Sequence, residues 1–284
     1  MKKLKGAIIA LILTAALAGC GGTTPAAATT TTAATAATEV TTTMATTTTT
    51  AATTTAPPET TTEATTTTVI SYSPIVREEI DPEKPIIALT FDDGPTDLTP
   101  QILDILEEKQ VVASFFLIGD NINDDTAQYV IREFEQGHEV DNHSKTHSQM
   151  PEMTFDEIAA EIQYTSDKVE ELIGIPTPFF RPPYIATNDV MYEAIDIPFI
   201  TGYLPNDYMD TVDVEQRIEN VKKSAKDGLV ILLHDFSGNV MTVEALPTII
   251  DNLKAEGYQF VTVSELFEVK GKTPEEGKAY TIVL

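Results

Sequence analysis

Cysteine, tryptophan, histidine and basic residues are all scarce in this 284-residue sequence, which has one Cys, no Trp, four His, and 18 Lys and Arg against 44 Asp and Glu. A single cysteine excludes a disulfide framework and any zinc site built from several thiolates. The net charge of −26 argues against nucleic-acid binding, which requires a basic surface, and against electrostatic attachment to anionic lipids. We therefore expect neither nucleic acid nor a charged membrane surface as a partner.

Residues 1–20 have the features of a secretory leader. Three lysines precede an apolar run over residues 7–17 that is too short to span a bilayer. The single cysteine follows in Leu17-Ala18-Gly19-Cys20, which resembles a bacterial lipobox. The resemblance implies that Cys20 is lipidated and anchors a secreted lipoprotein to the outer face of the bacterial cell membrane, with the lipid as its only membrane contact. The alternatives are an ordinary cleaved signal peptide or an incidental cysteine.

A linker and one domain are expected after the leader. Residues 21–68 consist almost wholly of Thr and Ala, with a few Pro and Glu. Such a segment lacks the large apolar side chains needed to offset the entropy of ordering, so we expect a disordered spacer. Residues 69–284 are enough for one large catalytic domain.

From residue 86 onward, strand-like and helix-like segments alternate. Strands are expected at 86–91, 111–118, 139–142, 179–180, 199–202, 229–233 and 258–263, and helices at 100–109, 127–136, 154–173 and 243–255. About seven such units indicate an α/β fold with a parallel sheet. Periodicity does not decide between an open sheet and a closed barrel.

Polar and ionisable residues gather where these strands end, which is where parallel-sheet proteins place their functional groups. The groups are Asp92-Asp93-Gly94-Pro95, His143 and His147, Arg181-Pro182-Pro183-Tyr184, Asp207-Tyr208, and His234-Asp235. Each alone has a structural explanation, such as a turn for Asp-Gly-Pro, a surface salt bridge for Arg181 and a core position for His234. Their coincidence at five strand ends favours a functional site.

The histidines separate into two kinds. His143 and His147 are four residues apart, a metal-ligand spacing that lies on one face of a helical turn. Two His and one Asp form a facial set of N and O ligands that suits zinc or a similar divalent ion. A free carboxylate beside the ion can act as base, and a separate His can protonate a leaving group, which together make a metal-assisted acyl hydrolysis. His138 is interpreted as structural.

Four motifs resemble those of polysaccharide deacetylases with a NodB homology domain, carbohydrate esterase family 4. They are Thr90-Phe91-Asp92-Asp93-Gly94-Pro95, His143-Ser144-Lys145-Thr146-His147, Arg181-Pro182-Pro183-Tyr184 and Leu232-Leu233-His234. The likeness extends over residues 85–266 and includes the order and spacing of the motifs. It implies a distorted (β/α) barrel of about seven strands and hydrolytic removal of acetyl groups from a polysaccharide.

The resemblance also implies a role for each matching residue in the reaction. Asp93, His143 and His147 would hold one divalent ion, with zinc as the expected metal. Asp92 would be the base that activates water. Arg181 would pair with Asp92 and orient it.

The remaining roles concern the leaving group and the substrate. His234 would be the acid that protonates the leaving amine or alcohol, and Asp207 would orient it. The backbone N–H of Tyr184 would stabilise the oxyanion, and Leu232 would line the pocket for the acetyl methyl group. Tyr208 stands where the family normally has a groove-lining Trp.

The sequence departs from the family pattern next to two of these positions. The third motif normally ends in Gly, but Ile185 follows Tyr184 here, which changes the conformational freedom of the loop. The residues before Asp207 also lack the usual acidic pattern. These departures bear on the substrate more than on the chemistry.

Three functions are compatible with these sequence features. The first is a deacetylase of N-acetyl sugars, in peptidoglycan or a chitin-like glycan, because a membrane-anchored enzyme would meet the cell wall first. The second is an acetylxylan esterase, because the same groups cleave O-acetyl esters. The third is a catalytically weak carbohydrate-binding module on the same fold.

Overall fold

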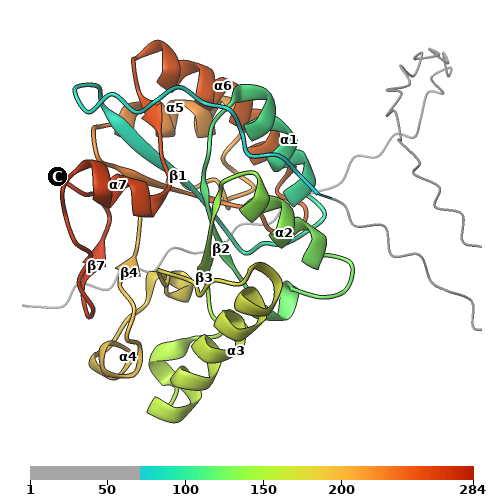
Figure 1. Ribbon diagram of the computed structural model, residues 1–284, viewed down its shortest axis with the longest axis vertical. Coiled ribbons are helices and arrows are strands. Elements are labelled where there is room, and N and C mark those ends of the chain that lie inside the picture. Colours follow the sequence, from blue (N-terminus) through green and yellow to red (C-terminus); the bar gives the residue numbers. More distant parts are fainter. Residues whose placement is uncertain (1–70) are drawn as a thin grey trace, which may run out of the picture. The chain divides into compact units, whose positions relative to one another are not determined.

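The computed structural model describes residues 71–284, so the leader and the linker expected over residues 1–68 lie outside the described part of the chain. Seven strands are described (Figure 1): β1 (Ile86–Asp92), β2 (Ser114–Leu117), β3 (Glu139–Asn142), β4 (Phe199–Ile200), β5 (Val230–His234), β6 (Gln259–Phe260) and β7 (Ala279–Tyr280). The α-helices are α1 (Thr99–Lys109), α2 (Ala127–Glu135), α3 (Phe155–Ile173), α4 (Asp189–Ala194), α5 (Val214–Ser224), α6 (Val240–Ala255) and α7 (Val263–Val269). Short 3-10 helices η1 (Gly119–Asn121), η2 (Met150–Glu152) and η3 (Pro183–Ile185) lie in connecting loops. Among these helices, none has the length and apolar character that a membrane span requires.

β1 is the centre of the main sheet, whose paired strands are all parallel. The order is β3-β2-β1-β5, and β6 pairs with the first two residues of β1. All seven residues of β1 are buried, as its nearly continuous apolar sequence predicts for a strand covered on both faces. In the pairing of β1 with β5, Asp92 lies opposite His234. Two of the predicted site residues therefore sit side by side at one end of the sheet.

Single bridges extend the sheet toward a closed barrel. Asn142 at the end of β3 bridges to Phe180, which in turn bridges to Phe199 in β4. A further bridge joins Tyr203 to Ile231 in β5, and β4 pairs with β7 in a separate two-stranded sheet. The fold is thus an irregular α/β barrel with a main sheet of five strands, which confirms the predicted fold class.

The alternation of side chains along β1 separates an outer layer from the barrel interior. Ile87, Leu89 and Phe91 belong to a hydrophobic cluster that includes residues of α1 and α6. Ile86 and Ala88 belong to a second cluster, together with residues of β2, β5 and α7. Because successive side chains point to opposite faces, Thr90 and Asp92 lie on the inner face. The base proposed from the sequence therefore ends the line of interior residues.

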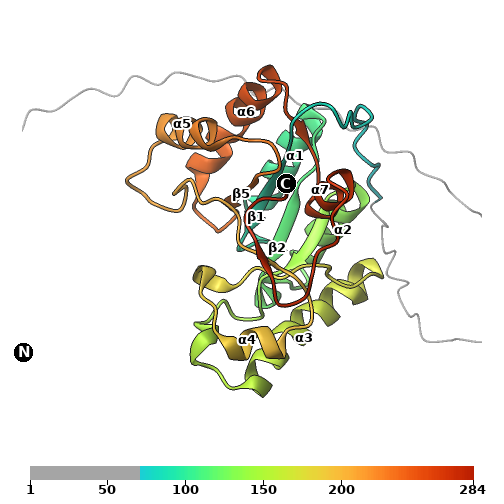
Figure 2. The same ribbon diagram turned by 90° about the vertical axis from the view of Figure 1, so that its left-hand side faces the viewer.

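The helices are distributed around the sheet as the two views show. α5 and α6 lie at one end of the described domain and α3 and α4 at the other (Figure 2).

The long helix α3 has the predicted boundaries, because Thr154 and Glu157 form a capping box at its start and Gly174 ends it at φ 78°. This helix lies over the loop that carries the paired histidines, where Glu161 accepts hydrogen bonds from the amides of Lys145 and Thr146.

Several predicted elements differ in detail from the structure. The segment 179–180 forms single bridges rather than a regular strand, and the last predicted strand is only β6, because α7 begins at Val263. α4, α5, α7 and β7 were not predicted. α5 places Val214, Ile218 and Val221 at helical spacing against the main hydrophobic cluster, so its sequence pattern could have identified this helix.

Candidate active site

Asp93, His143 and His147 form the centre of the site. One potential ligand atom from each lies within 4.8 Å of the others. Asp93 Oδ1 is 3.5 Å from His143 Nε2 and 3.4 Å from His147 Nε2. This oxygen is buried and has no hydrogen-bond partner within the described residues. A buried carboxylate oxygen facing two imidazole nitrogens is the environment expected of a divalent metal site.

The two histidines reach this arrangement from a loop, not from the helical turn that their spacing predicted. Residues 143–147 have no helical structure, and Ser144 and His147 have φ values of 65° and 56°. The Ser144 side chain accepts a hydrogen bond from the His147 amide at 3.0 Å, which stabilises the tight turn. Left-handed backbone conformations, rather than helical periodicity, bring the two rings together, with centroids 4.9 Å apart.

The hydrogen bonds and charges around the three residues suit metal binding. His143 Nδ1 lies 2.7 Å from the carbonyl oxygen of Arg181, which can only accept, so Nδ1 carries the proton and Nε2 is free to bind an ion. Burial lowers the pKa of His147, and the neighbouring His143 lowers it further against the opposing effect of Asp93. Burial would raise the pKa of Asp93, but the contact with His143 and the nearby imidazoles lowers it overall. Neutral imidazoles and a charged carboxylate are the ligand forms of these side chains.

Asp92 and Arg181 form a fully buried ion pair beside this triad. Arg181 Nη1 donates to Asp92 Oδ1 at 2.5 Å and to Thr90 Oγ1 at 2.8 Å, and its Nε donates to the carbonyl of Ile200 at 3.0 Å. The guanidinium stacks 3.8 Å from the ring centroid of Phe116. Because three neighbours fix Arg181, the guanidinium in turn fixes one oxygen of Asp92. The second oxygen, Oδ2, lies 3.6 Å from His143 Nε2.

Asp207 and His234 form a second buried pair on the same side of the barrel. His234 donates its backbone N–H to Asp207 Oδ2 and its ring Nδ1 faces Oδ1, both at 2.8 Å. Thr242 Oγ1 donates to the same carboxylate at 2.9 Å. Burial lowers the pKa of His234, but the hydrogen bond and charge of Asp207 outweigh this effect and raise it above the ordinary value. The raised pKa favours the protonated form of His234, the form that a general acid needs.

The remaining predicted residues line one cavity with these groups. The cavity has a volume of about 330 Å³ and is lined by Asp92, Asp93, His143, His147, Pro182, Tyr184, Ile185, Leu204, Tyr208, Leu232 and His234. The Tyr184 ring lies 4.5 Å from the ring of His147, and the Tyr208 ring lies 5.6 Å from that of His234. The two tyrosines are half-exposed at the mouth of the cavity.

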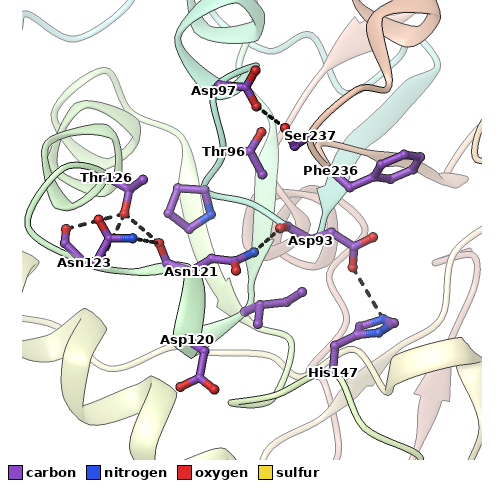
Figure 3. Close-up of a pocket in the computed structure, with 12 residues that line it drawn as sticks. Asp93, Thr96, Asp97, Asp120, Asn121, Asn123, Thr126, His147, Phe236 and Ser237 are labelled. Atoms are coloured by element: carbon purple, nitrogen blue, oxygen red, sulfur yellow. Dashed lines mark hydrogen bonds and ion pairs between the residues drawn. The ribbon is translucent and has the colours of Figure 1, made fainter.

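A second cavity, of about 490 Å³, adjoins the first (Figure 3). Asp93 and His147 line both cavities. Figure 3 shows Asn121 directed toward Asp93, whose backbone carbonyl accepts from Asn121 Nδ2 at 2.7 Å. Phe236 lies on this side of His234, with ring centroids 6.1 Å apart. The two cavities therefore meet at Asp93 and His147.

Asn121 and Phe236 line the second cavity and were not identified from the sequence, whereas Asp235, which follows β5, is buried behind the site without a predicted role. Asp235 donates its backbone N–H to the carbonyl of Asp92 at 2.7 Å, and its carboxylate accepts from Thr99 Oγ1 at 2.5 Å. A Cβ on Gly94 would lie 2.8 Å from Asp235 Oδ2, so the glycine permits this close approach. The rule that strand ends carry function would have identified Asn121, which follows β2.

All ten predicted site residues within the described chain lie at this site: Asp92, Asp93, His143, His147, Arg181, Tyr184, Asp207, Tyr208, Leu232 and His234. Cys20 lies outside the described residues. His138 lies apart from the cavity, is buried, and accepts a hydrogen bond from the Ala113 amide at 3.1 Å.

Comparison with known proteins gives consistent matches. The sequence model of a family described as polysaccharide deacetylase matches residues 79–197. A bifunctional xylanase/deacetylase of Pseudobutyrivibrio xylanivorans is 51% identical over 189 residues, which are 66% of this chain and 31% of that protein. The peptidoglycan-N-acetylglucosamine deacetylase PgdA of Listeria monocytogenes is 36% identical over 200 residues, 68% of this chain and 41% of that protein. The chain thus spans less than half the length of either relative.

A solved structure covers the domain more completely. The family 4 acetyl xylan esterase of Clostridium thermocellum, in complex with a cobalt ion, has a TM-score of 0.68 and 38% sequence identity. The match covers 70% of this chain and 98% of that one.

Proposed function

This chain belongs to the polysaccharide deacetylase family, carbohydrate esterase family 4, and on that premise we propose that it removes O-acetyl groups from xylan by metal-dependent hydrolysis. One observation carries the chemistry: the triad Asp93, His143 and His147 shares a cavity with Asp92 and His234. The chain thus has candidate groups for a metal site, a base and an acid around one cavity.

Zinc is the ion we propose for the triad. The donor set fits it, since two neutral imidazoles and one carboxylate leave open positions for water and substrate. When bound, such an ion polarises the acetyl carbonyl and lowers the pKa of a water molecule. The cobalt ion in the Clostridium thermocellum esterase supports a divalent metal.

Asp92 is the proposed general base. Its Oδ1 is fixed by Arg181, so Oδ2 faces the cavity beside His143 and is available to take a proton from the attacking water. Arg181 acts by positioning, because the barrel interior holds it through Thr90 and Ile200. As water adds to the acetyl carbon, the backbone N–H of Tyr184 is the proposed donor to the developing oxyanion.

His234 is the proposed general acid. Asp207 fixes its Nδ1, so Nε2 presents a proton to the cavity. The bond between the acetyl carbon and the sugar oxygen breaks as that oxygen takes the proton from Nε2. The products are acetate and a free sugar hydroxyl. Leu232 is proposed to contact the acetyl methyl group, and Tyr208 the sugar.

The choice of acetyl xylan rests on the relatives. The 51% identical protein combines a deacetylase with a xylanase, and the 38% identical structure is an acetyl xylan esterase. The relative acting on peptidoglycan is 36% identical, which supports N-acetyl sugars of the cell wall as the second candidate. The proposed base and acid would serve either reaction, since both reactions are hydrolyses of an acetyl group.

The location is proposed from the N-terminal sequence. A lipid on Cys20 would anchor the protein to the outer face of the membrane, and residues 21–68 would be its linker. Replacing Cys20 with Ala should then move the protein from the membrane fraction to the medium. Unchanged fractionation of Cys20→Ala would remove this proposal.

Acetate release by the full-length protein tests the function. We expect release from acetylated xylan in the presence of zinc or cobalt, and none after chelation. Preferred release from peptidoglycan would favour the second candidate. Stoichiometric metal binding without release from either polymer would favour a carbohydrate-binding module.

A further inference from the structure

Two consecutive residues at the cavity mouth have left-handed backbone conformations. Tyr184 has φ 58° and ψ 12°, and Ile185 has φ 54°. Seven non-glycine residues of the described chain have positive φ, and Ile185 is the one with a β-branched side chain. A β-branched residue in this region is a genuine outlier, because its branched Cβ meets the backbone.

Packing in the fold does not explain this isoleucine. Its side chain is 37% exposed and belongs to none of the hydrophobic clusters of the described domain. The loop after β4, whose Leu204 and Tyr208 line the same cavity, has Gly202 at φ 72° and Asn206 at φ 64°. Glycine and asparagine adopt left-handed conformations at little cost, so either would suit the backbone at position 185 better than isoleucine does. We therefore expect the isoleucine side chain to have a role in the cavity.

Ile185 lines the same cavity as Asp92, the metal triad and His234. It stands next to Tyr184, whose ring covers His147, and shares the lining with Leu204 and Tyr208. Apolar and aromatic side chains therefore form the mouth, while the metal ligands, Asp92 and His234 supply the polar groups. Glycine at position 185 would leave the space of a four-carbon side chain open.

We propose that Ile185 is a specificity-determining residue that narrows the cavity mouth, so that the acetylated unit is a pentopyranose rather than a hexopyranose with an exocyclic hydroxymethyl group. The inference rests on the proposed function, since it assumes a sugar ester as substrate. An uncharged pentose ring fits the apolar mouth, which offers no cationic side chain for an acidic sugar. In an apolar site, one carbon group more or less changes kcat/KM by about 10–200-fold.

Two substrates that differ only in that group test the proposal: acetylated xylo-oligosaccharides and acetylated cello-oligosaccharides. The full-length protein is assayed with zinc, and the ratio of the two kcat/KM values is compared among variants. We expect Ile185→Gly to lower the preference for the xylo-oligosaccharide by about tenfold or more, chiefly by raising kcat/KM on the cello-oligosaccharide. Ile185→Val keeps a β-branched side chain and should keep the preference near that of the wild type.

Gln110→Gly is the matched control. Gln110 is exposed, has φ 53° at the end of α1, and lies outside both catalytic cavities. Both glycine variants should unfold at a Tm unchanged or raised by up to about 4 °C, because glycine relieves the left-handed strain. Only Ile185→Gly should change the substrate ratio.

The outcomes separate this inference from the proposed function. If the wild type releases acetate and Ile185→Gly retains the wild-type ratio, the role of Ile185 is overturned. If Ile185→Gly fails to fold, Ile185→Asn replaces it, since Asn also tolerates left-handed conformations and removes the apolar branch. A wild type that releases no acetate from the xylo-oligosaccharide overturns the proposed function itself.

Discussion

Asp207 receives two hydrogen bonds from one residue, His234, through the backbone N–H and the ring, each at 2.8 Å. The carboxylate is fully buried, whereas the histidine reaches the cavity. A single acidic side chain therefore fixes the position, the tautomer and the charge of the proposed acid.

Replacing Asp207 with Asn should lower kcat and shift its pH dependence. Asp207 raises the pKa of His234, so the wild-type acid stays protonated above the ordinary histidine range. Without the charge of Asp207 the pKa of His234 falls. As pH is raised, the variant should therefore lose activity at a lower pH than the wild type. We expect kcat to fall by about 100-fold near neutral pH. The measurement is kcat against pH between 5 and 9.

Asp210→Asn is the control for this prediction. Asp210 is exposed, lies three residues away and does not line the catalytic cavity. Asp210→Asn removes the same charge, and the pH dependence of its kcat should match that of the wild type. An identical alkaline limb in Asp207→Asn and the wild type would contradict the assignment of His234 as the acid.

Substitutions of Asp92 and of Asp93 should have different effects on catalysis and on metal binding. Asp92→Asn removes the proposed base and should reduce acetate release by about 10²–10⁴-fold while metal content stays near one ion per chain. Asp93→Asn removes a ligand and should weaken metal affinity by at least about 10–100-fold, the loss typical of an outer-shell partner. Elemental analysis after dialysis and acetate release give the two readouts. Equal metal loss in both variants would show that Asp92 is itself a ligand.

Metal should also stabilise the folded domain. An ion that binds only the folded state at 100 times its Kd adds about 2.7 kcal/mol to the free energy of unfolding. We expect zinc to raise the Tm of the wild type and chelator to reverse the rise. His147→Gln should lose most of this shift. A zinc-dependent shift of the same size in His147→Gln would place the ion elsewhere.

His138 should make the domain less stable in acid. Burial, with help from Arg132 and Arg77, lowers the pKa of His138 to about 3, from an ordinary value of 6.5. Between these values the unfolded chain binds a proton and the folded chain does not, so the free energy of unfolding falls as pH decreases from 6.5 to about 3. The contribution over this window is on the order of 5 kcal/mol.

His138→Asn isolates this effect. The Asn carbonyl can replace Nδ1 as acceptor for the Ala113 amide, but it does not titrate. Urea unfolding of both proteins at several pH values should show a flatter dependence in the variant. Parallel curves between pH 4 and pH 6.5 would mean that His138 is accessible to protons in the folded state.

Sequence reasoning located the site because its residues follow regular elements. Asp92 and His234 end apolar strands, and their convergence follows from parallel pairing. The motifs of the family added the metal set and the barrel. α3 could be placed at both ends because Thr154, Glu157 and Gly174 give local capping signals.

The features that were missed depend on tertiary contacts. The loop at His143–His147 was expected to be helical, since spacing alone does not reveal left-handed residues such as Ser144. The contact of Asp235 with Thr99 joins positions 136 residues apart, which no local signal indicates.

The register of β1 and β5 has a consequence for how such proteins diversify. Asp92 and His234 are direct partners in adjacent strands, whose spacing of about 4.8 Å is set by backbone hydrogen bonds. Ile185, Leu204 and Tyr208 come instead from loops that no ladder constrains. Mutation can therefore reshape the entrance and change the accepted sugar while the two proton-handling groups keep their separation. The spacing of the base and the acid is thus set by the sheet, whereas the shape of the entrance is set by loops.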